Sequence, residues 1–373
     1  MVDRNAESPV LKTPCMRVGV VGCGTIAQVM HVPYLAELPA VELVALADPV
    51  QSRAQTLADR CNVPGRYSTA DELVADGDVE AVVVCTPSHT HADVVETTLD
   101  AGLHTFVEKP LAASPADGDR MVKAAAESDA VAMVGYMKRY DPAYERAREE
   151  LLSLDGVDLV TAYDIDPDHQ RIIEEVYDLI EGDPPASLIE ESRHERRRAI
   201  ESAIGTDEEL LVGAYDFQIE HVCHDVNVLR GLFGAVEAIE DVNVFADGRY
   251  ATARLTYEGG VPCVLESGDS ERKWFEEYVR VDGPNGMVRL SFSNPFIRNT
   301  PSELQVKRGI EELTDTTYTP SYDEPFKREL AWFVDCIDGE RAVRTSFQEA
   351  RADVELIADL FRTYQGLETH GAY

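Results

Sequence analysis

The sequence predicts two fold classes in one chain: an α/β domain with a doubly wound parallel sheet, then an α+β domain with an open antiparallel sheet. Short β-branched runs alternate with helical segments over residues 16–137, as in a parallel sheet covered by helices on both faces. After residue 235 the apolar runs are joined by turns that contain DG, GG and PNG, which is typical of antiparallel hairpins. A chain of 373 residues is also long enough for two separate cores.

The elements of the first domain follow from apolar spacing. Strands are expected where apolar and β-branched residues run together, at residues 16–21, 41–48, 81–87, 104–110 and 130–137. Helical spacing predicts helices at residues 25–38, 50–61, 91–102 and 115–128. The polar residues 1–15 precede the first strand and are expected to form a flexible tail. The first domain therefore covers residues 16–137.

The second domain, residues 138–373, has a different pattern of apolar and polar residues. A helix is expected at residues 143–154 and a strand at 157–164. Residues 165–210 are polar, acidic and mostly helical, with a break at GDPP, and predict an inserted helical hairpin. A helix at 214–232, the antiparallel segments, and amphipathic helices at 323–338 and 346–365 complete the chain.

The charge balance is strongly acidic. Acidic residues outnumber basic ones 69 to 34, which gives a formal net charge of −35. Such a surface repels nucleic acid and anionic membranes, so neither is expected as a partner. The acids are spread over the whole chain and only seven bases are lysine, which favours a halophilic type of surface over that of an ordinary acidic protein.

The cysteine pattern points to a reducing compartment. The seven cysteines are scattered and form no C-x-x-C pair, so neither a disulfide framework nor a zinc module is expected. The N-terminus lacks the apolar stretch of a signal peptide, and no apolar run is long enough to span a bilayer. Together these features predict a cytoplasmic protein.

A glycine-rich turn links the first strand to the first helix and predicts a nucleotide site. It fits the pattern G-x-G-x-x-A and runs Gly22, Cys23, Gly24, Thr25, Ile26, Ala27. Gly22 permits the tight turn, Gly24 lets the backbone approach a pyrophosphate, and Ala27 allows close packing of the helix. The strand–turn–helix context favours a Rossmann dinucleotide site over a helix cap with incidental glycines.

Asp48 ends the second strand, where an acid can bond the adenosine ribose. Its negative charge opposes a 2′-phosphate, so NAD is the expected cofactor. Arg53 follows five residues later and leaves NADP possible.

The carboxyl ends of the later strands predict further contacts, because ligands of such sheets lie at that edge. Thr86 and Pro87 follow the third strand and are expected to line the cofactor cleft. His91 is a further candidate cofactor contact, although starting a helix is the simpler role for it. Glu108 and Lys109 end the next strand. Lys109 is suited to bond a substrate hydroxyl and the nicotinamide ribose, with a pKa lowered by burial and the positive nicotinamide.

A helix in the second domain carries the remaining candidates. Glu220 and His224 are four residues apart and His221 and His224 three apart, so all three lie close together. A neutral histidine beside a carboxylate is a suitable proton acceptor from an alcohol near neutral pH. A metal site and a purely structural helix are the alternatives; no third ligand motif supports the metal.

Five segments together resemble one known family. VGVVGCGTIA, VVVCTPSHTHADVV, FVEKPLA, VGYMKRYDPAY and HVCHDVNVLRGLFG are similar to segments of the glucose–fructose oxidoreductase and inositol dehydrogenase family (Gfo/Idh/MocA). The resemblance runs from Met16 to the closing helices, except for residues 165–210. It implies an N-terminal Rossmann domain and a C-terminal open sheet that forms a homodimer or homotetramer interface.

The resemblance also implies an activity. Family members transfer hydride between a nicotinamide and a carbinol carbon of a sugar, inositol or related polyol. Lys109 and His224 match the catalytic lysine and histidine, and Glu220 stands where the family often has Asp, which puts its role in doubt. Met137, Lys138 and His221 are candidate substrate contacts, and no metal is expected.

Two other functions remain open at this stage. Some relatives hold NAD tightly and use it in a redox cycle for net hydrolysis or epimerisation. Others bind nucleotide as sensors without turnover, a role that the presence of both Lys109 and His224 argues against.

Overall fold

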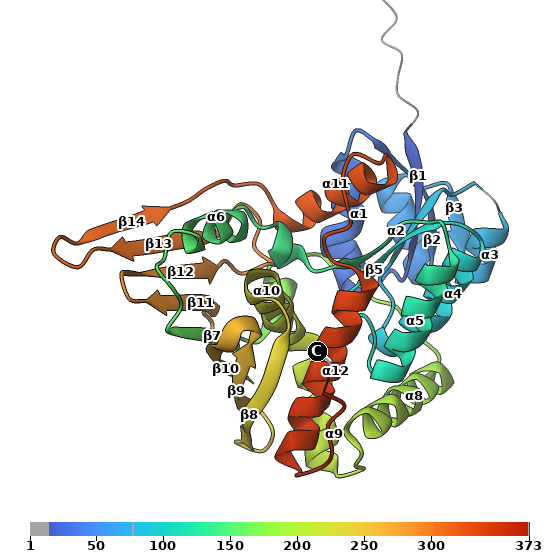
Figure 1. Ribbon diagram of the computed structural model, residues 1–373. Coiled ribbons are helices and arrows are strands. Elements are labelled where there is room, and N and C mark those ends of the chain that lie inside the picture. Colours follow the sequence, from blue (N-terminus) through green and yellow to red (C-terminus); the bar gives the residue numbers. More distant parts are fainter. Residues whose placement is uncertain (1–14, 77, 372) are drawn as a thin grey trace, which may run out of the picture.

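The computed structural model describes residues 15–76, 78–371 and 373. Two sheets organise the chain, one in each half of the molecule (Figure 1). The expectation of a flexible tail at residues 1–15 falls, except for Cys15, outside the described residues. No helix formed by the described residues is long and apolar enough to cross a membrane.

The first sheet confirms the doubly wound parallel prediction. Its six strands are in the order β3-β2-β1-β4-β5-β6, and every neighbouring pair is parallel. Their bounds are β1 Met16–Val21, β2 Val41–Ala47, β3 Gly65–Tyr67, β4 Ala81–Val84, β5 His104–Glu108 and β6 Ala132–Gly135. The order reverses between β1 and β4, which places the ligand crevice at the carboxyl ends of these two strands.

Helices follow the strands of this sheet. They are α1 Val32–Glu37, α2 Gln51–Cys61, α3 Ala70–Ala75, α4 His91–Asp100 and α5 Pro115–Glu127. The helix predicted at 25–38 is divided, because a π-helical turn at Ala27–His31 precedes α1. The short β3 and α3 are missed by the sequence prediction because three and six residues are too few to show a period.

The second sheet is mixed rather than wholly antiparallel. Its strand order is β14-β13-β12-β11-β7-β10-β9-β8. The bounds are β7 Leu159–Asp166, β8 Val236–Phe245, β9 Tyr250–Tyr257, β10 Val261–Asp269, β11 Glu276–Gly283, β12 Gly286–Phe292, β13 Glu303–Arg308 and β14 Thr314–Tyr318. The antiparallel prediction is wrong for β7 and β10, which pair in parallel. Because a long helical segment separates β7 from β8, the chain can return to the sheet with β10 beside β7 in the same direction.

The helical segment between β7 and β8 carries the candidates Glu220, His221 and His224. Helix α6 (Pro142–Leu151) precedes β7, and the predicted hairpin consists of α7 (His169–Val176) and α8 (Ala186–Ile204). The single helix predicted at 214–232 is wrong in detail: α9 spans Glu209–His221 and α10 spans Cys223–Phe233. The break coincides with the carbonyl of Glu220, which accepts a hydrogen bond from Lys109 Nζ at 2.9 Å.

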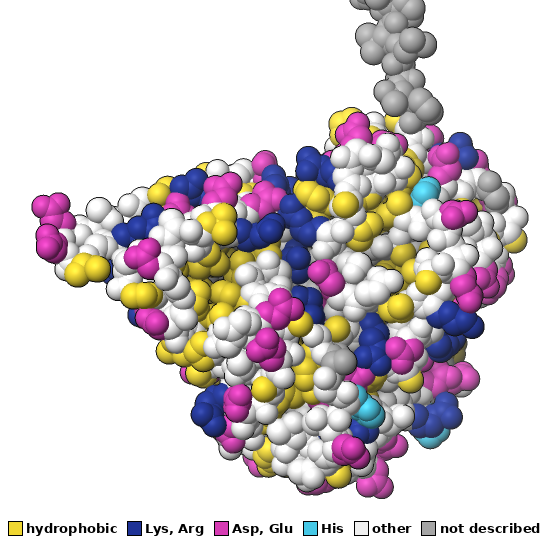
Figure 2. Space-filling model, in the orientation of Figure 1, with side chains coloured by type: hydrophobic (Ala, Val, Ile, Leu, Met, Phe, Trp, Pro, Cys, Tyr) yellow, Lys and Arg dark blue, Asp and Glu magenta, His cyan; other side chains and the backbone are white. Residues whose placement is uncertain are grey.

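The last two helices connect the two halves. Helix α11 (Pro325–Ile337) packs on α1 and on the π-helical turn, while α12 (Phe347–Tyr364) packs on α5 and also on β8 and α10. In Figure 1, α12 runs between the two sheets. On the face shown in Figure 2, Asp and Glu side chains are scattered over both halves instead of forming one patch.

Candidate active site

Two adjoining cavities lie at the carboxyl end of the parallel sheet. The smaller, of about 420 Å³, is bounded by β5, α9, α10, β7 and β11. The larger, of about 820 Å³, is bounded by the glycine-rich turn, the end of β2 and helix α8. Both are lined by Thr25, Ile26, Thr86 and Pro87. The two cavities therefore adjoin in one cleft, referred to below as its substrate end and its cofactor end.

The glycine-rich turn has the geometry that a pyrophosphate requires. Gly22 has φ +93°, and a Cβ there would lie 2.5 Å from the carbonyl oxygen of Cys85. A Cβ on Gly24 would have no neighbour within 4 Å, and Gly24 lines the cofactor end. Only glycine fits the first position, while the second leaves space for a ligand against the bare backbone. These residues fit a dinucleotide.

Asp48 lines the cofactor end and is held by the turn itself. Its Oδ2 accepts a hydrogen bond from the Cys23 N–H at 2.8 Å and its Oδ1 one from the Val50 N–H at 2.7 Å. Arg53 Nη1 approaches Oδ2 at 3.4 Å. Asp48 therefore fixes the glycine-rich turn, and its remaining lone pairs are available to a ribose hydroxyl.

His91 does not meet the expectation of a cofactor contact. It is fully buried and lines neither end of the cleft. Its Nε2 lies 2.8 Å from the Thr86 carbonyl, and its Nδ1 lies 3.1 Å from those of Pro110 and Leu111. His91 therefore connects the loops after β4 and β5. Ala27 is likewise buried behind the turn, which agrees with its packing role.

Lys109 enters the substrate end from β5. Its Nζ donates to the Glu220 carbonyl at 2.9 Å. Burial lowers the pKa of Lys109, but the neighbouring Cys223, Glu220 and Glu108 outweigh burial and raise it above the ordinary value. The expectation of a lowered pKa is wrong for the protein without cofactor, and Lys109 is a charged donor here.

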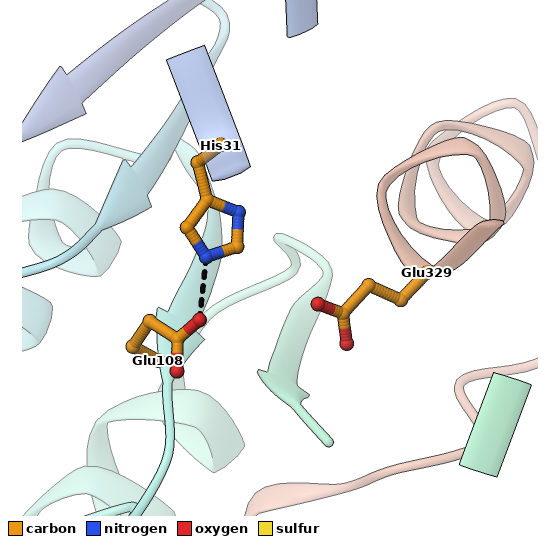
Figure 3. Close-up of side chains that lie close together, drawn as sticks. All are labelled: His31, Glu108 and Glu329. Atoms are coloured by element: carbon orange, nitrogen blue, oxygen red, sulfur yellow. Dashed lines mark hydrogen bonds and ion pairs between the residues drawn. The ribbon is translucent and has the colours of Figure 1, made fainter. Parts of the chain in front are cut away.

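Glu108, which lines the substrate end, belongs to a buried cluster behind it. Figure 3 shows Glu108 with His31 and Glu329, from three different elements. His31 Nε2 lies 2.5 Å from Glu108 Oε1, and Glu108 Oε2 accepts from the Lys109 N–H at 2.9 Å. Within the described part of the chain, neither oxygen of Glu329 has a partner. Burial and the charge of Glu108 raise the pKa of Glu329 well above its usual range, so it is a neutral acid at neutral pH.

Glu220 is held by three elements. Its Oε1 accepts from Ser88 Oγ at 2.7 Å and from Arg196 Nη2 at 3.0 Å, and its Oε2 lies 3.8 Å from Lys109 Nζ. Burial raises the pKa of Glu220, but Lys109 and Arg196 outweigh it and the pKa lies below its usual value. No hydrogen bond between Glu220 and His224 is found among the described residues. Glu220 therefore orients Lys109 rather than His224.

His224 lies in the first turn of α10 and lines the substrate end. Its ring meets that of Tyr136 edge-on, with centroids 6.2 Å apart. Burial, and then the positive charges of Lys138 and Lys109, hold the pKa of His224 well below its usual range. His224 is therefore a neutral imidazole beside a charged lysine.

His221 lines the same end but has the opposite charge state. Its Nδ1 lies 2.8 Å from Asp166 Oδ2, and its Nε2 lies 3.5 Å from Asp164 Oδ2. Burial lowers the pKa of His221, but Asp164 and Asp166 outweigh it and raise it to about 10. Burial raises the pKa of Asp164 to about 7. His221 is thus a fixed cation and unsuited to accept a proton.

The two remaining candidates also line the substrate end. Lys138 is buried and forms an ion pair with the buried Glu277. Burial, despite the charge of Lys138, raises the pKa of Glu277 to about 8. Behind this pair, burial and Asp164 raise the pKa of Asp225 well above its usual range. Met137 supplies an apolar side chain to the same wall.

The cleft thus brings together all the sequence candidates except Ala27 and His91. Sequence reasoning missed the acids that oppose them, Asp164, Asp166 and Glu277, and the insert residue Arg196. The acids had a detectable signal, because Asp164 and Asp166 are two apart in a strand and so point to one face. Arg196 had none, since it is one of four arginines in the segment RHERRR.

The fold and the cleft define a class: a protein with a dinucleotide-binding parallel sheet joined to a mixed-sheet domain that supplies titratable groups. Residues 16–136 match the oxidoreductase family with the NAD-binding Rossmann fold, Gfo/Idh/MocA. The family match is confined to the N-terminal domain of this chain.

Curated relatives match the same part. The chain is 32% identical over 134 residues to myo-inositol 2-dehydrogenase of Thermotoga maritima, covering 36% of this chain and 40% of the relative. It is 36% identical over 132 residues to inositol 2-dehydrogenase of Salmonella typhimurium, covering 35% and 39%. The matched segment thus spans about two fifths of the length of these relatives.

Solved structures extend the likeness to the second domain. The UDP-N-acetylglucosamine 3-dehydrogenase of Acidithiobacillus ferrooxidans has a TM-score of 0.68 at 20% identity, covering 93% of this chain and 97% of that one. The 3-ketoreductase KijD10 of Actinomadura kijaniata, solved with NADP and TDP-benzene, has a TM-score of 0.70 at 19% identity, covering 94% and 97%. At these identities the likeness shows the fold alone, over both described domains.

Proposed function

We propose that the protein is an NAD(P)-dependent dehydrogenase that transfers hydride between the nicotinamide and a carbinol carbon of a sugar, inositol or related polyol. One observation carries the proposal: charged Lys109 and neutral His224 line one cavity, which adjoins the cavity beside Gly22 and Gly24. The inositol dehydrogenases that the N-terminal domain resembles support the substrate class.

The proposed chemistry divides between the two residues. The nicotinamide, when bound, supplies the hydride acceptor. The Lys109 ammonium donates to the substrate hydroxyl and stabilises negative charge as it develops on that oxygen. The neutral imidazole of His224 accepts the hydroxyl proton, and Glu220 keeps Lys109 charged and oriented.

The substrate end is suited to a compound with many hydroxyl groups. Its wall offers fixed donors on Lys138 and His221 and acceptors on Asp166 and Glu277. Such paired groups can bond several hydroxyls of a neutral ring without leaving a buried charge alone.

The test is a panel of sugars and polyols with NAD and with NADP, followed by absorbance of the reduced nicotinamide. Reduction with one compound establishes the dehydrogenase and its substrate class. Confirmed nucleotide binding with no reduction across the panel would contradict the proposal and favour redox cycling or sensing. We propose NAD over NADP, since Asp48 lines the cofactor end and repels a 2′-phosphate.

We further propose a homodimer or homotetramer formed through the eight-stranded sheet. Its outer face carries the stacked rings of Tyr163 and Tyr278, 5.2 Å apart, with Arg289 over the second ring at 4.0 Å. These side chains are only half-buried, as expected of a face that packs against a second subunit. Light scattering tests the oligomeric state, and a monomeric mass would contradict the proposal.

The compartment and salt proposals rest on composition. All seven cysteines are free, which supports a reducing cytoplasm. The net charge of −35 supports adaptation to high salt, because salt screens repulsion between carboxylates. We expect the melting temperature to rise as KCl is raised from 0.1 M towards the molar range, where screening becomes almost complete. A melting temperature that does not rise would contradict the halophilic interpretation.

A further inference from the structure

The inserted segment forms one wall of the cofactor end. Helix α8 faces the glycine-rich turn and the end of β2 across the larger cavity. Residues of α8 that line it recur at helical spacing, among them Leu188, Ser192 and Glu195. Pro184, just before the helix, lines it as well. One face of the first half of α8 is therefore turned to the cavity that Gly22 and Gly24 also line.

The start of this wall is fastened to the first domain. The Gln28 side chain donates to the Ile180 carbonyl at 3.1 Å and accepts from the Ile180 N–H at 2.7 Å. Arg60 Nη1 donates to the Asp178 carbonyl at 2.8 Å. A Cβ on Gly182 would lie 2.7 Å from Val50 Cγ1, so the chain passes directly over the loop after β2.

The far end of the wall is hydrogen-bonded to the loop after β4. Ser192 Oγ lies 3.0 Å from His89 Nε2. Arg196 Nη1 donates to Ser88 Oγ at 3.1 Å, in addition to its bond with Glu220. The segment from Ile180 to Arg196 thus crosses the cleft and is bonded to the π-helical turn at one end and to the loop after β4 at the other.

Two apolar side chains of this wall face the cavity. Leu188 and Ile189 both line the cofactor end, and Ile189 remains 37% exposed. Asp48 and Thr69 line the same cavity and supply polar groups. An apolar surface that shares a cavity with an acid placed to bond a ribose is suited to pack against the flat face of an adenine base.

We propose that α8 is part of the dinucleotide site: Leu188 and Ile189 cover the adenosine half, and the fastened segment 180–196 slows release of the cofactor. This inference rests on the proposed function, because it requires that a dinucleotide occupies the cleft. It assigns a binding role to a segment for which the family resemblance supplies no counterpart.

The test is NADH release from the full chain, followed by nucleotide fluorescence after displacement with excess NAD. We expect the double variant Leu188→Ala, Ile189→Ala to release NADH about tenfold faster. The apolar contact area that it removes corresponds to roughly a tenfold loss of affinity, and a loss of affinity of this kind appears mainly as a higher dissociation rate constant. Leu210→Ala is the matched control. It removes a similarly exposed leucine of α9, 41% exposed, that lines neither end of the cleft, and should release NADH at the wild-type rate.

A second measurement needs no variant. Amide hydrogen exchange of residues 184–196 in the wild-type protein should slow when NADH is added. Release within twofold of wild type in the folded double variant, or unchanged exchange in this segment, would overturn the inference while leaving the dehydrogenase proposal intact. If the wild-type protein binds neither NADH nor NADPH, the proposed function itself fails, and the inference fails with it.

Discussion

The two ends of the cleft are built in different ways. At the cofactor end the site is shaped by backbone groups and by residues without a side chain: Gly22, Gly24 and the N–H groups that hold Asp48. At the substrate end they are buried ionisable side chains in pairs, such as Lys138 with Glu277 and His221 with Asp166. The first end recognises a ligand by shape and close approach, and the second by fixed charge.

This difference predicts different consequences of substitution. A change at the cofactor end alters the space available to a ligand, and its effect depends on local backbone geometry. A change at the substrate end leaves a buried partner uncompensated, which costs folding free energy as well as binding. Lys109 lines the substrate end and should affect turnover above all.

The largest effect is expected for Lys109→Ala. We expect it to lower kcat by about 10³-fold, since it removes charge stabilisation at the reacting oxygen, and to change the NADH dissociation constant by less than about threefold. Steady-state kinetics and a fluorescence titration measure the two quantities. Lys123→Ala, an exposed lysine on α5, is the control and should match wild type. Equal losses of turnover and nucleotide affinity would contradict the assignment.

Lys138→Met tests the substrate end through stability. Above about pH 8, where Glu277 is ionised, the variant leaves a buried carboxylate without its cation, and breaking a buried pair costs about 3–5 kcal/mol. Urea unfolding should show this loss, and adding Glu277→Leu should recover much of it, because the double variant has no unpaired charge. Lys123→Met serves as the exposed control. A loss below about 1 kcal/mol, typical of an exposed pair, would show that the pair is solvated rather than buried.

Much of the cofactor end could be predicted from the sequence, because it is local. The turn from Gly22 to Ala27 and the strand before it are contiguous, so one short pattern reports both the conformation and the ligand. The helix at 214–232 was located for the same reason, although its break at Val222 was not. That break coincides with a bond from Lys109, more than a hundred residues away.

The substrate end could be predicted only in part, because its charges are paired across the fold. Glu277 alternates with the buried Val279 and Val281, so its burial could be predicted, but its partner Lys138 lies 139 residues away in the sequence and no local pattern reports the pairing. The same holds for the charge of His221, which is set by Asp164 and Asp166 on another element. The role of Arg196 depends on where an insert folds back, and no local pattern reports this.

Paired glycine variants sharpen the comparison at the cofactor end. Gly22→Ala forces a side chain onto a residue with φ +93° and against a backbone oxygen, so we expect it to lower the unfolding free energy by about 2 kcal/mol. Gly24→Ala meets open space and should fold normally. Its new methyl group occupies the room for the pyrophosphate and should weaken NADH binding by about tenfold. Urea unfolding and fluorescence titration distinguish the two. A Gly24→Ala variant that binds NADH as wild type would contradict the placement of the pyrophosphate.

Behind the cleft, Glu329→Gln is expected to have no effect on stability near pH 5 and an effect that grows as the pH rises. Because the pKa of Glu329 is raised in the folded state, its protonated form favours folding. Its contribution is complete below the unfolded pKa of about 4.3 and is lost as the pH rises towards the folded value. Within this window each pH unit lowers the free energy of unfolding by up to about 1.4 kcal/mol through this one group.

Glutamine resembles the neutral acid in shape and does not ionise. The variant should therefore be about as stable as wild type near pH 5 and should lose less stability up to pH 9. The remaining decline belongs to other buried acids, among them Asp225, Asp164 and Glu277, the last two with pKa values raised to about 7 and about 8. Urea unfolding at four pH values measures how the free energy of unfolding changes with pH in the variant and in wild type. The exposed Glu127→Gln is the control. Parallel curves for Glu329→Gln and wild type would show that Glu329 is ionised in the fold, and that an unseen cation or solvent compensates its charge.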